Sequence, residues 1–220
     1  MHLEHLIYSI AIAIIAGGIY LKYANKDYSW IIIASAYAPD LDLFLETLLG
    51  IFGIDLLIHG KPITHGDFHN LAVMLLFAVI IALLLQSFKI RFRDSFIFAF
   101  IGFGAHLVED ALVYNPAYAF FWPISDQKYG IGLFDYSRDL YGIADPEVLI
   151  VGLMTVMILV TIRMRYEGNE WITNMVVPNY LLIFYVKIRN QTHLWIKRLN
   201  NEYKIIGSKS KIINNEIADR

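Results

Sequence analysis

Histidine and aspartate recur in the first half of the chain at a spacing that could bind a metal ion. His65 and His69 are four residues apart in "HGDFHN", and His106 and Asp110 are four residues apart in "HLVED". Residues i and i+4 share one face of a helix, so each pair could present two ligands to the same ion. The chain has no cysteine. Such a site would therefore use imidazole nitrogen and carboxylate oxygen, which suit zinc first and manganese or iron next.

Further candidate ligands precede these two pairs. "PDLD" contains two aspartates, and another histidine stands before the first apolar run. The predicted ligand set is four histidines and three aspartates: His5, Asp40, Asp42, His65, His69, His106 and Asp110. One zinc ion needs only three or four side chains, so the set predicts a site for a divalent metal with one ion or two.

Simpler interpretations exist for several of these residues. Asp40 could cap a helix N-terminus, and His5 could be a solvated terminal residue. Thr64 could cap a helix that begins at His65. Asp110 is harder to explain in this way, because an aspartate within an apolar span costs about 2.5–3.5 kcal/mol. A partner or a function has to offset that cost.

The composition places these residues in a membrane protein. Of the 220 residues, 57% are hydrophobic and 17% are charged, and this balance is typical of chains that reside in a bilayer. Predominantly apolar runs of near membrane length lie at Leu6–Leu21, His69–Phe88, Ser95–Tyr114 and Glu147–Thr161.

Three other apolar segments are too short or too interrupted to be simple spans. Trp30–Ala38 ends before Pro39, so we predict a half-span or a buried helix. Leu41–Phe52 is rich in leucine but contains two acidic residues, which predicts an amphipathic helix at the membrane interface. Trp171–Val186 stays ambiguous, because asparagine and proline interrupt it. The predicted fold is an all-α, polytopic integral membrane helical bundle with about four to six membrane helices and this interfacial amphipathic helix.

Composition also predicts how the chain is divided. Residues 1–125 form the predicted membrane core with the metal site, 126–145 a polar loop, 146–186 one or more further membrane helices, and 187–220 a basic polar tail. The tail carries eight basic and three acidic residues without a pattern of stacking aromatics. Membrane lipids are therefore its expected partner, and nucleic acid is not.

Counting membrane crossings brings the predicted ligands to one face. His5 precedes the first span, the half-span returns the chain to "PDLD", and the next two spans return it to His106 and Asp110. This count survives an error of several residues at any boundary. The basic clusters at 22–26, 89–93 and 163–165 fall at the opposite face. The positive-inside rule then predicts a multi-pass protein of the cell membrane with its metal site on the external face.

Several phrases of the sequence are similar to the motifs of a known family. "HLIYS" resembles the opening phrase of that family, and "PDLD" matches its Pro-Asp-x-Asp phrase. "GFGAHLVEDALVYNPAYAFFWP" resembles its span with Gly-x-x-x-His-x-x-x-Asp followed by Trp-Pro. The family is the YdjM-type group of predicted membrane-bound metal-dependent hydrolases, small inner-membrane proteins of bacteria and archaea. Over residues 1–125 the resemblance assigns His5, Asp40, Asp42, His106 and Asp110 to the metal site.

A fourth family motif differs in this chain. Family members carry His-Arg-Gly-x-Thr-His-Ser before a hydrophobic span, whereas "HGDFHN" has more closely spaced histidines and lacks the arginine. Pairing His65 with His69 keeps a histidine directly before the span, and we prefer this alignment. The alternative pairs His59 with His65 as the ligands, whereas the preferred alignment keeps His59 only as a reserve ligand.

The ligands and the resemblance together predict hydrolysis by metal-activated water, since bound zinc lowers the pKa of water to about 7. Glu109 and Asp67 neighbour predicted ligands and are the candidate general bases. A site in the membrane favours a lipid-like or amphipathic ester, and a phosphoester above all. Two other functions stay open: a non-catalytic scaffold whose helix ends a metal clamps, and a metal transporter. A transporter would place its ligands near the bilayer midplane.

Overall fold

The structure is a computed structural model that describes residues 2–55, 57–58, 60–133, 146–172, 186, 189, 191–193 and 195–197. Backbone contacts divide the chain into two units, residues 1–176 and 177–220. The described residues of the second unit are helical, and the rest of this section concerns the first unit. His59, most of the predicted polar loop, most of the basic tail and most of 171–186 lie outside the described residues.

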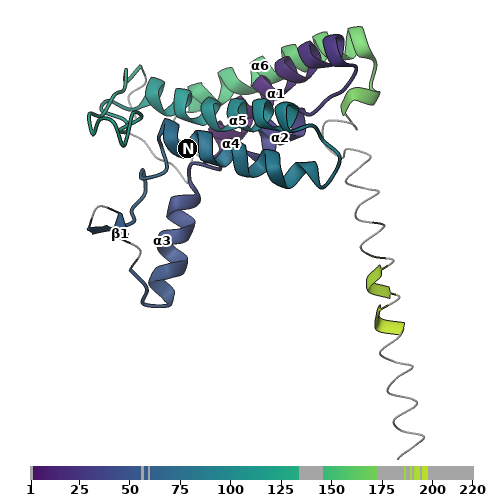
Figure 1. Ribbon diagram of the computed structural model, residues 1–220. Helices are drawn as coiled ribbons and strands as arrows, with labels where there is room; N and C mark the ends of the chain where they lie inside the picture. Colours follow the sequence, from purple (N-terminus) through teal and green to yellow (C-terminus); the bar gives the residue numbers. More distant parts are fainter. Residues whose placement is uncertain are drawn as a thin grey trace, which may run out of the picture. The chain divides into compact units, whose positions relative to one another are not determined.

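The described part of the first unit is mostly helical (Figure 1). Its helices are α1 (His2–Ala24), α2 (Ser29–Ala34), α3 (Leu41–Ile51), α4 (Leu71–Gln86), α5 (Phe92–Val113) and α6 (Pro146–Glu167). A short antiparallel hairpin, β1 (Leu57–Ile58) and β2 (Lys61–Pro62), follows α3. The all-α prediction is confirmed.

The helices have the lengths and compositions of a membrane protein. Among the described residues, three helices are long and apolar enough to cross a membrane: α1, α5 and α6. The 16 apolar residues of α4 rise about 24 Å, somewhat less than a hydrocarbon core of about 30 Å. The predicted half-span Trp30–Ala38 forms a shorter helix, α2, because the chain leaves the helix in turns before it reaches Pro39.

A glycine allows α2 to pack directly against α5. A Cβ at Gly102 of α5 would lie 2.7 Å from Ser35 Cβ and 2.9 Å from Ile32 Cα. Those distances are shorter than carbon atoms tolerate, so only glycine fits without moving a helix. Small residues at such crossings are the usual way in which membrane helices approach closely. α2 also packs against α1, while α4 packs along α5 and α6 along α1.

A buried ion-pair cluster joins α6 to the far end of α1 and to the α1–α2 linker. The guanidinium of Arg163, only 4% exposed, donates from Nη2 to Asp27 Oδ2 at 2.6 Å and from Nε to Glu167 Oε2 at 2.8 Å. Its Nη1 donates to the Ile14 carbonyl at 3.2 Å, and its Cζ lies 4.6 Å from the ring centre of Trp171. This cluster fixes the position of α6.

Helix α3 points away from the bundle formed by the other helices (Figure 1). It matches the predicted amphipathic segment Leu41–Phe52, and Asp42 is its one buried residue. Its large apolar side chains are exposed, with Phe44 61% and Ile51 74% accessible. An apolar helix that leaves the protein core suits the membrane interface, which remains the predicted location of α3.

Candidate metal centre

Residues from four separate segments meet at one end of the bundle. His5 lies early in α1, Asp40 in the turn before α3, His69 just before α4, and His106 and Asp110 in the last turns of α5. Side chains within these segments form three overlapping groups that could hold a metal: His5, His106 and Asp110; Asp40, His69 and His106; and Asp42, His65 and His69. The structure therefore brings together all seven residues that the sequence singled out.

The distances at the middle of this cluster fit a tetrahedral ion. Asp110 Oδ2 lies 3.4 Å from Nε2 of both His69 and His106. Asp40 Oδ1 lies 3.5 Å and 3.6 Å from the same two nitrogens. These are long for hydrogen bonds, whereas zinc bonded at about 2.0–2.2 Å holds its ligand atoms about 3.3–3.6 Å apart. Each of these four nitrogen–oxygen distances matches the distance between two ligand atoms of one zinc ion.

Several of these buried atoms make no hydrogen bond within the described part of the chain. They include both ring nitrogens of His69, Nε2 of His106 and Oδ2 of Asp110. Each residue is at most 1% exposed, and a buried polar atom without a partner normally costs stability. A metal ion would satisfy these atoms together.

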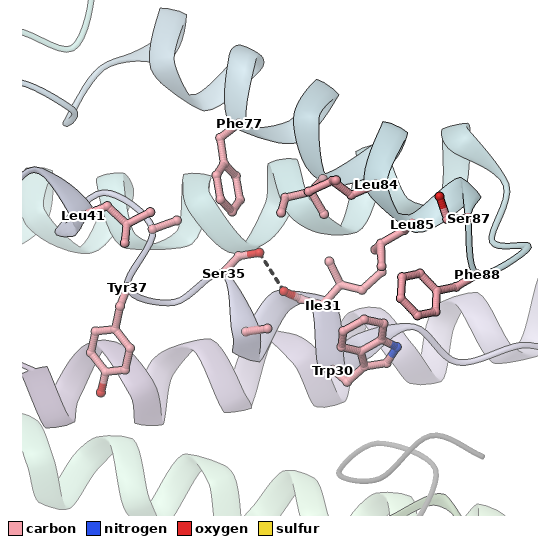
Figure 2. A pocket seen from close by; sticks show the side chains of 13 residues that line it. Trp30, Ile31, Ser35, Tyr37, Leu41, Phe77, Leu84, Leu85, Ser87 and Phe88 are labelled. Atoms are coloured by element: carbon pink, nitrogen blue, oxygen red, sulfur yellow. Dashed lines mark hydrogen bonds between the residues drawn. The ribbon is translucent and has the colours of Figure 1, made fainter. Parts of the chain in front are cut away.

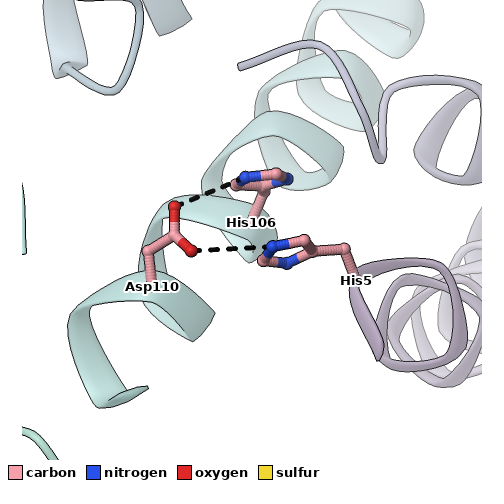
Figure 3. Close-up of side chains that lie close together, drawn as sticks. All are labelled: His5, His106 and Asp110. Carbon is pink, nitrogen blue, oxygen red and sulfur yellow. Dashed lines mark ion pairs between the residues drawn. The ribbon is translucent and has the colours of Figure 1, made fainter. Parts of the chain in front are cut away.

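The carboxylate of Asp110 also faces a third imidazole, that of His5. Its Oδ1 lies 3.6 Å from Nε2 of His5, while its Oδ2 faces His106 (Figure 3). The rings of His5 and His106 stack with centroids 3.8 Å apart. The two oxygens of one carboxylate thus point to different imidazoles, an arrangement that could join two metal ions.

Hydrogen bonds on the opposite ring nitrogens orient these histidines. Nδ1 of His106 donates to the Ala36 carbonyl at 2.7 Å, so Nε2 is left to face Asp110. Nδ1 of His5 lies 2.9 Å from Glu109 Oε2 and directs Nε2 in the same way. A carbonyl or carboxylate behind a histidine is the usual support of a metal ligand. This contact with His5 suits a role for Glu109 in orienting the His5 ring. The role of general base that the sequence predicts for Glu109 stays a prediction.

Asp42 shapes the loop that carries two of the histidines. Its carboxylate accepts the backbone N–H groups of Gly66 at 2.8 Å and Phe68 at 3.1 Å, and Oδ1 lies 3.1 Å from Nδ1 of His65. Its Oδ2 also lies 3.5 Å from Nδ1 of His69. Most of the hydrogen-bonding capacity of Asp42 is thus used to hold the loop. The arrangement suits a supporting residue better than a direct ligand.

One prediction about this loop is wrong. His65 and His69 do not share the face of a helix, because residues 65–68 form turns and α4 begins at Leu71. The cap of α4 is Asn70, whose side chain accepts the N–H of Val73 at 2.9 Å. The asparagine competes successfully for the cap position because its side-chain oxygen satisfies a free N–H of the first turn.

The other predicted base, Asp67, points back into its own loop. Its Oδ2 accepts the backbone N–H of Thr64 at 2.7 Å and lies 3.3 Å from the Thr64 hydroxyl. This contact closes the turn at residues 64–67, and the carboxylate of Asp67 does not point toward the predicted metal ligands. Thr64 and Asp67 do interact, but not as the start of a helix.

Tyr118 is a neighbour of the site that sequence reasoning missed. Its hydroxyl lies 3.3 Å from Nε2 of His65, and its ring centre is 4.1 Å from that of His69. The loop can approach this ring only through Gly66, which has φ of +104° and where a Cβ would lie 2.8 Å from Tyr118. The glycine in "HGDF" was the available signal, since it marks a close approach.

The carboxylates around His69 attract positive charge. Burial disfavours the charged ring, but Asp40, Asp42 and Asp110 outweigh it and raise the pKa of His69 from 6.5 to about 9. Burial likewise raises the pKa of Asp42, but its bonds with His65, His69 and the Phe68 N–H outweigh this and lower that pKa overall. The carboxylates around His69 therefore favour a positive charge at this position, such as a divalent metal would supply.

Comparison with known proteins gives one match. The family model described as "YdjM inner membrane protein" matches residues 1–191, which include all the residues discussed above. Comparison with curated proteins and with solved structures gave no match.

Proposed function

Because the chain belongs to the YdjM inner membrane protein family, we propose that it is a membrane-bound hydrolase that uses metal-activated water on a lipid-like ester, a phosphoester above all. The observation that carries the proposal is the placement of Asp110, whose two oxygens face different imidazoles at 3.4–3.6 Å. A carboxylate that joins two ions about 3.5–4 Å apart is a common basis of metal-dependent hydrolysis. The donor set favours zinc, with manganese or iron next.

The two proposed metal positions have different roles. Bound there, a divalent metal would supply the Lewis acidity that activates water and polarises the ester. Asp40, His69, His106 and Asp110 Oδ2 would together hold one ion with four protein ligands. His5 Nε2 and Asp110 Oδ1 supply only part of a second set. The ester is therefore expected to enter beside His5.

The two candidate general bases, Glu109 and Asp67, differ in how their contacts relate to the metal centre. Glu109 contacts His5 and orients the ring that faces Asp110, so we assign it a positioning role. Asp67 is bonded to Thr64 and would have to leave that turn to accept a proton from water. Of the two, Glu109 is the better candidate to influence turnover.

Metal content and turnover measured together test this proposal. The purified, zinc-loaded protein is expected to hold two ions per chain and to hydrolyse a phosphodiester or phosphomonoester probe. His5→Ala is expected to keep one ion and to lose activity by at least about 100-fold, because the open position disappears. His193→Ala, an exposed histidine of the second unit, is the matched control and should change neither quantity. Turnover that persists in His5→Ala would overturn the assignment of the open position.

A metal clamp is the second candidate function. Four protein ligands close a tetrahedral zinc site, as they do in structural zinc centres. The set made by Asp40, His69, His106 and Asp110 would tie α5 to the segments before α3 and α4. A protein that binds metal tightly but hydrolyses no ester would favour this alternative. Metal uptake into vesicles would instead favour a transporter, although the predicted ligands lie at helix ends rather than at a midplane.

We also propose that the metal centre faces the outside of the cell membrane. Lys22 lies in the last turn of α1 and Lys26 follows that helix, and basic residues from Lys89 to Arg93 span the junction between α4 and the start of α5. Arg163 contributes little to this argument, because Asp27 and Glu167 neutralise it. The remaining cations still indicate that this end is cytoplasmic.

Reporter fusions test the orientation. A fusion at Arg91 is expected to report the cytoplasm and one at Gly130 the exterior, because α5 crosses the membrane between them. If both fusions report the same compartment, the crossing count is wrong. If each reports the compartment opposite to the expected one, only the orientation is wrong.

A further inference from the structure

An apolar groove runs along α4 on the lipid side of the bundle. It has a volume of about 560 Å³ and lies between α2 and α4 (Figure 2). Its walls include Trp30, Ile31 and Ala34 on one side and Phe77, Ile81 and Leu84 on the other. This volume is within the usual range for binding sites of small molecules.

Most of the lining of the groove is apolar, and its polar side chains are Ser35, Tyr37, Ser87 and the indole of Trp30. The hydroxyl of Ser35 donates to the Ile31 carbonyl at 2.7 Å and is therefore already used. α4 has no charged residue from Leu71 to Gln86. A site of this kind does not retain water, which needs polar partners. Its occupant has to be a hydrocarbon that comes from the bilayer.

One end of the groove is formed by residues that flank a predicted metal ligand in the chain. Ala38 and Leu41 line this end, and Asp40 lies between them in the chain. Oδ1 of Asp40 faces Nε2 of His69 at 3.5 Å. A hydrocarbon chain in the groove could therefore carry a polar group directly to the predicted metal ligands. The same end is the start of α3, the helix with the exposed apolar surface.

We propose that this groove binds one acyl chain of an amphipathic ester and directs its polar head toward the metal centre. The reaction at that head rests on the proposed function, whereas binding of the chain does not. The chain would lie along α4 with its end near Trp30 and Phe88, which line the far part of the groove (Figure 2). The substrate class is thus a lipid with a long chain, rather than a soluble ester.

Tryptophan fluorescence gives a direct test of binding, because Trp30 lines the groove. The full chain in detergent would be titrated with a long-chain lysophospholipid brominated on its acyl chain, which quenches nearby tryptophan. The chain has four tryptophans, so saturable quenching of the Trp30 component is expected, and this component should be absent in Trp30→Phe. Ala34→Phe fills the groove from an exposed position of its wall and should weaken quenching at least about tenfold, since two or more methylene groups lose contact.

Two controls decide the result. Leu83→Phe adds a ring to the exposed face of α4 outside the groove and should quench like the wild type. A brominated short-chain lysophospholipid should quench weakly. Equal quenching by long and short chains, or equal loss in Ala34→Phe and Leu83→Phe, would overturn the proposal.

Turnover separates this proposal from the proposed function. If the protein hydrolyses long-chain esters, Ala34→Phe should raise KM more for a long-chain ester than for a short-chain ester, whereas Leu83→Phe, outside the groove, should change neither KM. Saturable quenching without any turnover would leave the groove as a lipid site and reject the hydrolase. Turnover that is independent of chain length and of Ala34→Phe would keep the hydrolase and reject the groove.

Discussion

Replacing His106 with alanine is expected to remove metal from the centre and to abolish turnover, and replacing His69 in the same chain should then cost little more. Both histidines face the same two carboxylate oxygens, of Asp40 and Asp110. Loss of either one leaves a site that no longer closes around an ion. Residues that act as one unit show such non-additive losses. The measurement is metal per chain by elemental analysis, with turnover, for the two single variants and the double variant.

His59, the reserve ligand of the sequence analysis, provides the internal control. His59→Ala is expected to leave metal content unchanged, because our alignment pairs His65 with His69. The opposite pattern, metal lost in His59→Ala but kept in His69→Ala, would show that the alternative alignment is right. Additive losses in the His69 and His106 variants would mean that the two rings serve separate sites.

Replacing Arg163 with leucine should destabilise the protein by about 3–5 kcal/mol, because two carboxylates would remain buried without their partner. Asp27 is only 5% exposed at its side chain and Glu167 24%. Arg163→Lys should restore only part of the loss, since an ammonium cannot make the forked contact with both carboxylates. The measurement is the unfolding midpoint in detergent. Metal content of the folded fraction should not change, because the cluster joins the end of α1 that is far from His5.

Arg165 offers a matched control on the same helix. It is exposed, and Arg165→Leu should change stability by no more than about 0.5 kcal/mol. The combined variant Asp27→Leu with Arg163→Leu should recover stability relative to Arg163→Leu, because it removes one of the stranded charges. Equal effects of Arg163→Leu and Arg165→Leu would contradict the role of the buried cluster.

The crossing count was the strongest part of the sequence prediction, for a physical reason. It required only that His5, Asp40, His69, His106 and Asp110 fall at the same ends of successive helices. That result does not depend on where each helix begins or ends, and the structure does bring these side chains together. Their role as metal ligands remains a prediction. The helical pairing of His106 with Asp110 was also correct, since α5 extends through both.

Other features depend on contacts that a sequence does not reveal. The pairing of His65 with His69 on a helix failed because Asn70 caps α4 and the preceding residues turn around the carboxylate of Asp42. The support of His106 comes from a backbone carbonyl, that of Ala36, and a carbonyl has no sequence signature. The groove is likewise a product of how α2 and α4 pack.

The glycine at the crossing of α2 and α5 links the spacing of these two helices to the geometry of the metal centre. Gly102 lies one helical turn before His106, and the segment that it admits, from Ile32 to Ala36, supplies the carbonyl that holds the His106 ring. A single added methyl group would push that segment outward and release the Nδ1 proton of His106 from its acceptor. The ring could then carry its proton on the nitrogen that faces Asp110, where a metal needs a lone pair. The absence of a side chain at Gly102 thus helps to keep the proton of the His106 ring on Nδ1.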